Sequence, residues 1–152
     1  MSLSTLLQNI ADAEQGPKTC AVFDFDGTII SGYSATAFLK DQIDRGEISP
    51  ADLVQLTQAA TRFGIGSLGF SALMAVHAQY LAGRSETDYI ANSERLFRRA
   101  IAKLIYPEAR QLIEAHRAAG HSIAIISSAT PYQVLPAAKD LGIEHVYATN
   151  LE

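Results

Sequence analysis

Apolar residues change their spacing along the chain in a way that predicts strands, helices and one long helical insertion. A short apolar run ends at Val22 and Phe23, and a second covers residues 122–126. Both runs are typical of buried strands. From about residue 33 to 104 apolar residues recur every three or four positions, as they do on helices. Residues 146–149 form a third short run, so the predicted order is strand, helical insertion, helix, strand, helix, strand.

Capping residues predict several helix boundaries. Ser49-Pro50-Ala51-Asp52 is typical of a helix start, and Ser85 with Asp88 three positions later is typical of another. Pro136 falls inside the last predicted helix, where it predicts a bend or a late start. Further boundaries are expected at Pro107, Gly120, Thr130-Pro131-Tyr132-Gln133 and Gly142.

This order of elements predicts an α/β fold with a Rossmann-like parallel sheet and right-handed crossovers. Residues 1–31 and 105–152 are expected to form the α/β core. Residues 32–104 are too many for an ordinary loop and carry apolar faces of their own. We therefore expect them to form a helical cap inserted after the first strand.

Composition excludes several classes of protein. The net charge of -4 leaves no basic footprint for a nucleic acid. No apolar run approaches the length of a membrane span, and residues 1–16 lack the features of a signal peptide. Apolar residues between positions 3 and 10 instead predict a short helix packed on the domain. The single cysteine, Cys20, is expected to be buried in the first strand, and its being alone fits a reducing, cytoplasmic location.

Two carboxylates follow the first strand, at Asp24 and Asp26, and Gly27-Thr28 comes next. Side chains alternate along a strand, so the two carboxylates are expected to project together from its carboxyl end, where open α/β sheets bind ligands. Converging carboxylates repel unless a cation lies between them or one is protonated. Oxygen ligands favour Mg²⁺. An isolated Asp-x-Asp is more often a turn or a helix cap, but the flanking apolar strand and Gly-Thr make this string far more specific.

A second polar group, Ser127-Ser128, follows the strand at residues 122–126 and precedes a predicted helix. A hydroxyl at the N-terminus of a helix suits a phosphate group, because free N–H groups and the positive end of the helix dipole meet there. Taken alone this pattern is weak, since serine and threonine before a helix are mostly caps.

Together these motifs resemble a known family. The string from Val22 to Thr28 resembles the first motif of the haloacid dehalogenase superfamily, and Ser127 resembles the second. The helical insertion between them resembles subfamily IB, which includes phosphoserine phosphatases, and the resemblance covers nearly all of residues 19–152. It implies a Mg²⁺-dependent phosphatase that hydrolyses small phosphate monoesters through an aspartyl-phosphate.

The resemblance also implies a role for each site residue. Asp24 is the nucleophile, and Asp26 protonates the leaving alcohol and then deprotonates water. Mg²⁺ is held by the Asp24 carboxylate and the Asp26 backbone carbonyl. The phosphoryl oxygens are held by Ser127 and by backbone N–H groups near Gly27, Thr28 and Ser128.

The chain departs from the family pattern in two respects. The lysine and the late acidic residues that complete the family's site have no match, and Lys139 lies too far along a helix to be assigned that role. We therefore expect a fragment of a longer chain, with a bare edge on its first strand and little or no activity alone. Residues 31–34 also lack the acidic residue that binds the substrate amine in phosphoserine phosphatases. A fused lysophospholipid acyltransferase is one candidate for a missing C-terminal partner.

Alternatives remain open. A non-catalytic remnant would bind a phosphorylated ligand or a partner through its exposed edge. A receiver domain of two-component signalling fits poorly, because receivers lack a helical insertion and carry the phosphorylated aspartate on a later strand. His77 is expected to be a packed core histidine. A solvated face, or else a surface that steers an anionic substrate, is expected at Arg95, Arg98, Arg99 and Lys103.

Overall fold

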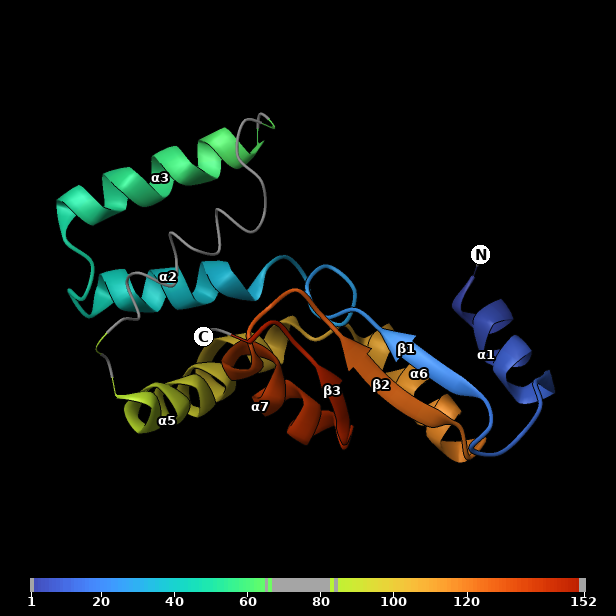
Figure 1. The fold of residues 1–152 in the computed structure, drawn as a ribbon. Coiled ribbons are helices and arrows are strands. Elements are labelled where there is room, and N and C mark those ends of the chain that lie inside the picture. The colour runs from blue at the N-terminus through green and yellow to red at the C-terminus, as the bar shows by residue number, and fades with distance from the viewer. Residues whose placement is uncertain (1, 65, 67–82, 84, 151–152) are drawn as a thin grey trace.

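The computed structural model describes residues 2–64, 66, 83 and 85–150 (Figure 1). Residues 67–82 of the predicted helical insertion, with His77, lie outside the described residues. The described elements are α1 (Leu3–Asp12), β1 (Cys20–Phe23), α2 (Ser34–Asp44), α3 (Pro50–Gly64), α5 (Glu86–Leu96), the π-helix η1 (Phe97–Ile101), the 3₁₀-helix η2 (Ala102–Leu104), α6 (Pro107–Ala118), β2 (Ser122–Ile126), α7 (Pro131–Leu141) and β3 (His145–Tyr147). None of these helices is long and apolar enough to cross a membrane.

The three strands form one parallel sheet in the order β1-β2-β3, which confirms the predicted α/β class. Phe23 pairs with Ile125, and Ile126 pairs with Tyr147. Because the strands are parallel and in close register, their carboxyl ends meet at one edge of the sheet. In the described part of the chain no strand pairs with the outer side of β1.

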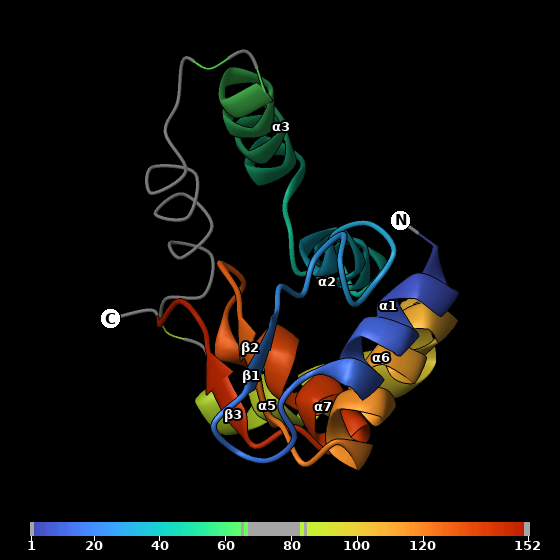
Figure 2. The same ribbon diagram turned by 90° about the vertical axis from the view of Figure 1, so that its right-hand side faces the viewer.

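Helices cover one face of this sheet. α6 packs on β2 and α7 packs on β3, and α1 lies outside α6 (Figure 2). The first helical residue of both α6 and α7 is a proline, whose missing N–H costs nothing at that position. Gly142 ends α7 with a left-handed backbone, at φ +64°. Of the bend or late start predicted from Pro136, the late start is wrong, because α7 begins at Pro131 and includes Pro136. The bend stays a prediction.

The opposite face of the sheet is open in the described structure. Cys20 is exposed, and so are the large side chains of Val22, Ile126 and Tyr147. The expectation that Cys20 is buried is therefore wrong. Its strand does lie in the sheet, but no described element covers the face toward which Cys20 points.

The described parts of the insertion are mostly helical, and the Ser49–Asp52 pattern does open α3. Ser85 caps α5 by accepting a hydrogen bond from the Asp88 N–H at 3.3 Å. The last predicted helix of the insertion is not continuous. It changes at Phe97 to a π-helix and at Ala102 to a 3₁₀-helix before the chain re-enters the core.

A buried carboxylate joins α2 to the α5–η1 segment. Asp41 is 1% exposed and forms ion pairs with Arg45, Arg95 and Arg99. Burial opposes its ionisation, but hydrogen bonds from Arg95 and Asn92 and the nearby guanidinium charges outweigh burial and lower its pKa. Arg95 and Arg99 are thus more than a solvated face, and the partner that the sequence did not reveal is Asp41.

Candidate active site

The predicted site residues lie at the carboxyl edge of the sheet. Asp24 follows the last residue of β1, and Ser127 follows the last residue of β2. These two strands are hydrogen-bonded neighbours running in the same direction. The structure therefore brings the two predicted motifs to one edge of the sheet, although about 100 residues separate them in the chain.

The two carboxylates have different surroundings. β1 ends at Phe23, so strand alternation does not by itself determine where Asp24 and Asp26 point. Asp24 is exposed, and its Oδ1 accepts the N–H of Phe25 at 2.7 Å. Asp26 is half-buried and lies at the N-terminus of α2, where its Oδ1 accepts the N–H of Ser34 at 2.7 Å and its Oδ2 accepts the Ser34 hydroxyl at 3.2 Å. A carboxylate in this place is favoured by the free N–H groups and dipole of the helix.

The pKa of Asp26 is raised above its ordinary value. Burial is the largest cause, and the negative charge of Asp24 adds to it, while the two hydrogen bonds from Ser34 act in the opposite direction. A carboxyl group with a raised pKa keeps its proton to a higher pH than an ordinary aspartate, which is the direction that a general acid requires.

The proton of the Ser127 hydroxyl has no acceptor among the residues that the structure describes. Its Oγ accepts the N–H of Ala129 at 3.1 Å, and the side chain is buried at the start of the turn into α7. Because that contact uses an oxygen lone pair, the hydroxyl hydrogen remains available for an acceptor such as a phosphate oxygen. Ser128 is exposed, and its N–H has no acceptor within the described residues.

The loop after Asp26 is tightly turned. Gly27 has a left-handed backbone, at φ +75°, and its N–H donates to the Gly32 carbonyl at 2.9 Å. The Thr28 N–H donates to the Phe25 carbonyl at 3.3 Å. Both N–H groups predicted to face phosphate thus have partners within the loop, and the one from Thr28 is at the longer distance.

The sequence predicts Mg²⁺ beside Asp24 and Asp26. Asp24 offers an exposed carboxylate, and the chemistry of such a ligand fits Mg²⁺. Within the described residues, however, no three His, Cys, Asp or Glu side chains gather at one place. The assignment of Asp24 and the Asp26 carbonyl as metal ligands stays a prediction, and these two oxygens would fill only part of a coordination shell.

Two residues that support Asp26, one directly and one through the other, were not identified from the sequence as site residues. Ser34 is fully buried, and Gln133 donates from Nε2 to the Ser34 Oγ at 3.1 Å. Gln133 belongs to the capping pattern at residues 130–133, and that pattern is present in the structure. The pattern predicts the local cap but not the contact with Ser34, which lies 99 residues away.

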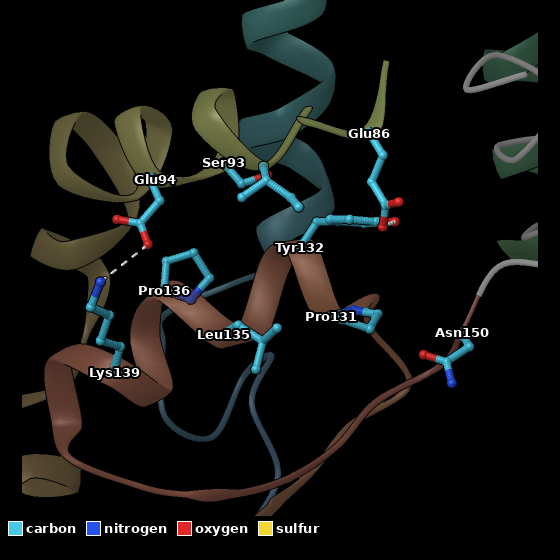
Figure 3. Close-up of a pocket in the computed structure, with 10 residues that line it drawn as sticks. Glu86, Ser93, Glu94, Pro131, Tyr132, Leu135, Pro136, Lys139 and Asn150 are labelled. Atoms are coloured by element: carbon cyan, nitrogen blue, oxygen red, sulfur yellow. Dashed lines mark hydrogen bonds and ion pairs between the residues drawn. The ribbon is translucent and has the colours of Figure 1, made fainter. Parts of the chain in front are cut away.

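A cavity of about 610 Å³ opens between α5 and α7 (Figure 3). Lys139 lies on its wall, 3.8 Å from Glu94, and Tyr132 donates a hydrogen bond to Glu86 at 2.8 Å. None of the predicted site residues lines this cavity. Lys139 is exposed there and paired with Glu94.

Curated relatives of the chain include phosphatases. A protein named histidinol-phosphatase, from Neisseria meningitidis, is 27% identical over 136 residues, which cover 89% of this chain and 61% of the relative. Phosphoserine phosphatase SerB1 from Mycobacterium tuberculosis is 29% identical over 137 residues, covering 87% of this chain and 44% of the relative. The chain thus spans between two fifths and three fifths of the length of these relatives.

Solved structures show the same fold. A protein of unknown function from Bordetella pertussis matches with a TM-score of 0.79 and 23% identity, over 88% of this chain and 60% of that one. A phosphoserine phosphatase solved as a phospho-aspartyl intermediate analogue matches with a TM-score of 0.61 and 18% identity, over 90% of this chain and 58% of that one. The sequence pattern of the haloacid dehalogenase-like hydrolases matches residues 21–152, and the chain belongs to that family.

Proposed function

We propose that this chain carries the nucleophile and the acid/base of a phosphatase that hydrolyses small phosphate monoesters. The observation that carries the proposal is the meeting of Asp24, Asp26 and Ser127 at one sheet edge in a haloacid dehalogenase-like domain. The names of the relatives, histidinol-phosphatase and phosphoserine phosphatase, support the same class of substrate. The helical insertion supports placement in subfamily IB, with residues 32–104 as the cap.

The reaction has two steps. A carboxylate oxygen of Asp24 attacks phosphorus and the bond to the alcohol oxygen breaks, while Asp26 gives its proton to the departing oxygen. Asp26 then takes a proton from water, and the water oxygen attacks the phosphorus of the aspartyl-phosphate. Inorganic phosphate leaves, and the Asp24 carboxylate is restored.

Other groups would stabilise charge on the phosphoryl oxygens. The Ser127 hydroxyl and the Ser128 N–H are both available for this purpose, because neither proton has an acceptor within the described residues. The N–H groups of Gly27 and Thr28 would have to leave their loop acceptors to join them. Mg²⁺ held by the Asp24 carboxylate and the Asp26 carbonyl would supply positive charge against the same oxygens.

The test is turnover of a generic aryl phosphate with Mg²⁺ by a longer protein that contains residues 1–152, because these residues alone are expected to have little or no activity. Phosphoserine and histidinol phosphate follow as substrates. Asp24→Asn should abolish turnover, by roughly 10³-fold or more, because an amide cannot form the covalent intermediate. Borohydride reduction during turnover should convert Asp24 to homoserine, detected by mass spectrometry. Asp12→Asn, an exposed substitution on α1, is the matched control and should keep full activity.

A second candidate is a non-catalytic domain that binds a phosphorylated ligand. The exposed apolar face beside the site favours it, since such surfaces often serve as interfaces. Binding of phosphate or phosphoserine without turnover, lost in Ser127→Ala, would favour this alternative over the phosphatase.

A further inference from the structure

A chain of buried hydrogen bonds connects Asp26 to the first turn of α7. It starts at Thr130, passes through the side chains of Gln133 and Ser34, and ends on the Asp26 carboxylate. Thr130, Gln133 and Ser34 are all buried. Since water has little access to these groups, each donor and acceptor depends on its protein partner.

The orientation of the Gln133 amide is determined by the helix cap. Its Oε1 accepts both the N–H of Thr130, at 2.8 Å, and the Thr130 hydroxyl, at 2.9 Å. Reversing the amide would place two donors against the Thr130 N–H, which can only donate. The Nε2 atom must therefore face Ser34 as a donor.

The orientation of the Gln133 amide also determines how the Ser34 hydroxyl meets the Asp26 carboxylate. The Ser34 Oγ accepts from Gln133 Nε2 at 3.1 Å, so its single proton is directed to the Asp26 Oδ2 at 3.2 Å. The Ser34 N–H fills the other oxygen, Oδ1, at 2.7 Å. Both oxygens of Asp26 thus have a defined donor. The direction of every hydrogen bond in the series, from donor to acceptor, is determined by the contacts of Thr130 with Gln133.

We propose that Gln133 is a positioning residue that acts through the Ser34 hydroxyl to orient the Asp26 carboxylate. The naming of Asp26 as the acid/base rests on the proposed function, but the orientation itself does not. Thr130 lies three residues after Ser127, and Ala129 between them donates to the Ser127 Oγ. The phosphate-binding turn and the acid/base are therefore held by one network that starts at the N-terminus of α7.

The variant Gln133→Glu tests this proposal because it separates two roles of the residue. Glutamate at the third helical position keeps an acceptor for Thr130 and so keeps the capping box, but it has no donor for Ser34 when ionised. Nuclear magnetic resonance of the 152-residue protein reports the result through the backbone amide of residue 34. We expect that amide proton to move upfield and to exchange with solvent about tenfold faster, the effect of one weakened hydrogen bond, while the amides of α7 remain unchanged.

A double-mutant comparison distinguishes action through the hydroxyl from a general structural effect. Ser34→Ala alone should produce a change of the same direction, and adding Gln133→Glu to it should produce no further change at residue 34. The neutral variant Gln133→Met should reproduce the effect of Gln133→Glu, which excludes the added charge as the cause. An unchanged residue-34 amide in both single Gln133 variants, or equal effects of Gln133→Glu with and without the Ser34 hydroxyl, would overturn the proposal. None of these measurements requires substrate turnover, so the network is tested separately from the proposed phosphatase.

Discussion

The two faces of the sheet are built from similar residues but have different surroundings. On the covered face, Phe23, Ile125 and Val146 pack into the hydrophobic core with α6 and α7. On the open face, the side chains of Val22 and Ile126 alternate with them along the same strands and are more than half exposed. Neighbouring residues of one strand therefore differ in burial because of what lies above each face.

This difference shows what an apolar run can predict. The runs at residues 20–23 and 122–126 are apolar on both faces, which is typical of parallel strands covered on both sides. Within the described residues only one side has its helices. An apolar run therefore predicts a strand reliably, whereas the cover over each face depends on elements elsewhere in the chain or assembly.

The largest expected effect is the difference between Ile125→Ala and Ile126→Ala. Ile125 is 0% exposed and Ile126 is 52% exposed, so the same substitution at adjacent positions tests the two faces. Ile125→Ala should lower the free energy of unfolding by about 2–5 kcal/mol, because it leaves a cavity in the core. Ile126→Ala should cost less than about 1 kcal/mol. Urea denaturation measures both values, and equal costs would show that the open face is covered in solution.

Several parts of the fold could be predicted because their signals are local. The strand at residues 122–126, the start of α3 at Pro50 and the left-handed end of α7 at Gly142 all depend on residues close together in sequence. The π-helix at Phe97–Ile101 was not predicted, because an apolar spacing of three or four does not distinguish it from a continuous α-helix.

The candidate site also has a part that local sequence predicts and a part that it does not. The placement of Asp24 and Ser127 at one edge follows from strand ends that the sequence already indicates. Their roles and those of Asp26 stay predictions. The contacts of Ser34 with Gln133 and of Asp41 with Arg95 and Arg99 join distant segments, and no local pattern states which helix faces will meet. The sequence therefore indicates the groups next to the expected substrate more clearly than the residues that hydrogen-bond to those groups.

The second-largest expected effect is a change in self-association when the open face is altered. β1 is an edge strand in the described structure, and exposed Val22 lies on it. Exposed apolar edge strands promote association, and a lysine on the edge opposes it. Val22→Lys should therefore reduce concentration-dependent light scattering, with a change in unfolding free energy within about 1 kcal/mol. The adjacent Ala21→Lys places the charge on the buried side and should instead destabilise the fold.

Cys20 gives a smaller and purely chemical comparison of the two faces. It is the single cysteine of the chain, so every thiol signal belongs to it. Because its side chain is exposed on the open face, a water-soluble thiol reagent should modify it in the folded protein within about tenfold of the rate in urea. Strong protection that disappears only on unfolding would show that the open face is occupied under native conditions.

The smallest expected effect is a pH dependence of stability that arises on the covered face, where the ring of Phe23 contacts His116 of α6. The two rings are 6.0 Å apart edge to face, and His116 Nδ1 lies 2.9 Å from His121 Nδ1. Burial lowers the pKa of His116, and a charge on His121 lowers it further.

The folded protein therefore binds a proton at His116 less readily than the unfolded chain does. In the unfolded chain the histidine has its ordinary pKa of 6.5. Stability should be constant above that pH and should fall as the pH decreases from about 6.5 toward the lowered pKa, because the unfolded state gains its proton first. In thermal unfolding this amounts to a few degrees at most, and His116→Asn should remove that part of the pH dependence. An unchanged pH profile in His116→Asn would contradict the assignment, while Val22→Ala on the open face should leave the profile as it is, because that side chain does not contact the histidine pair.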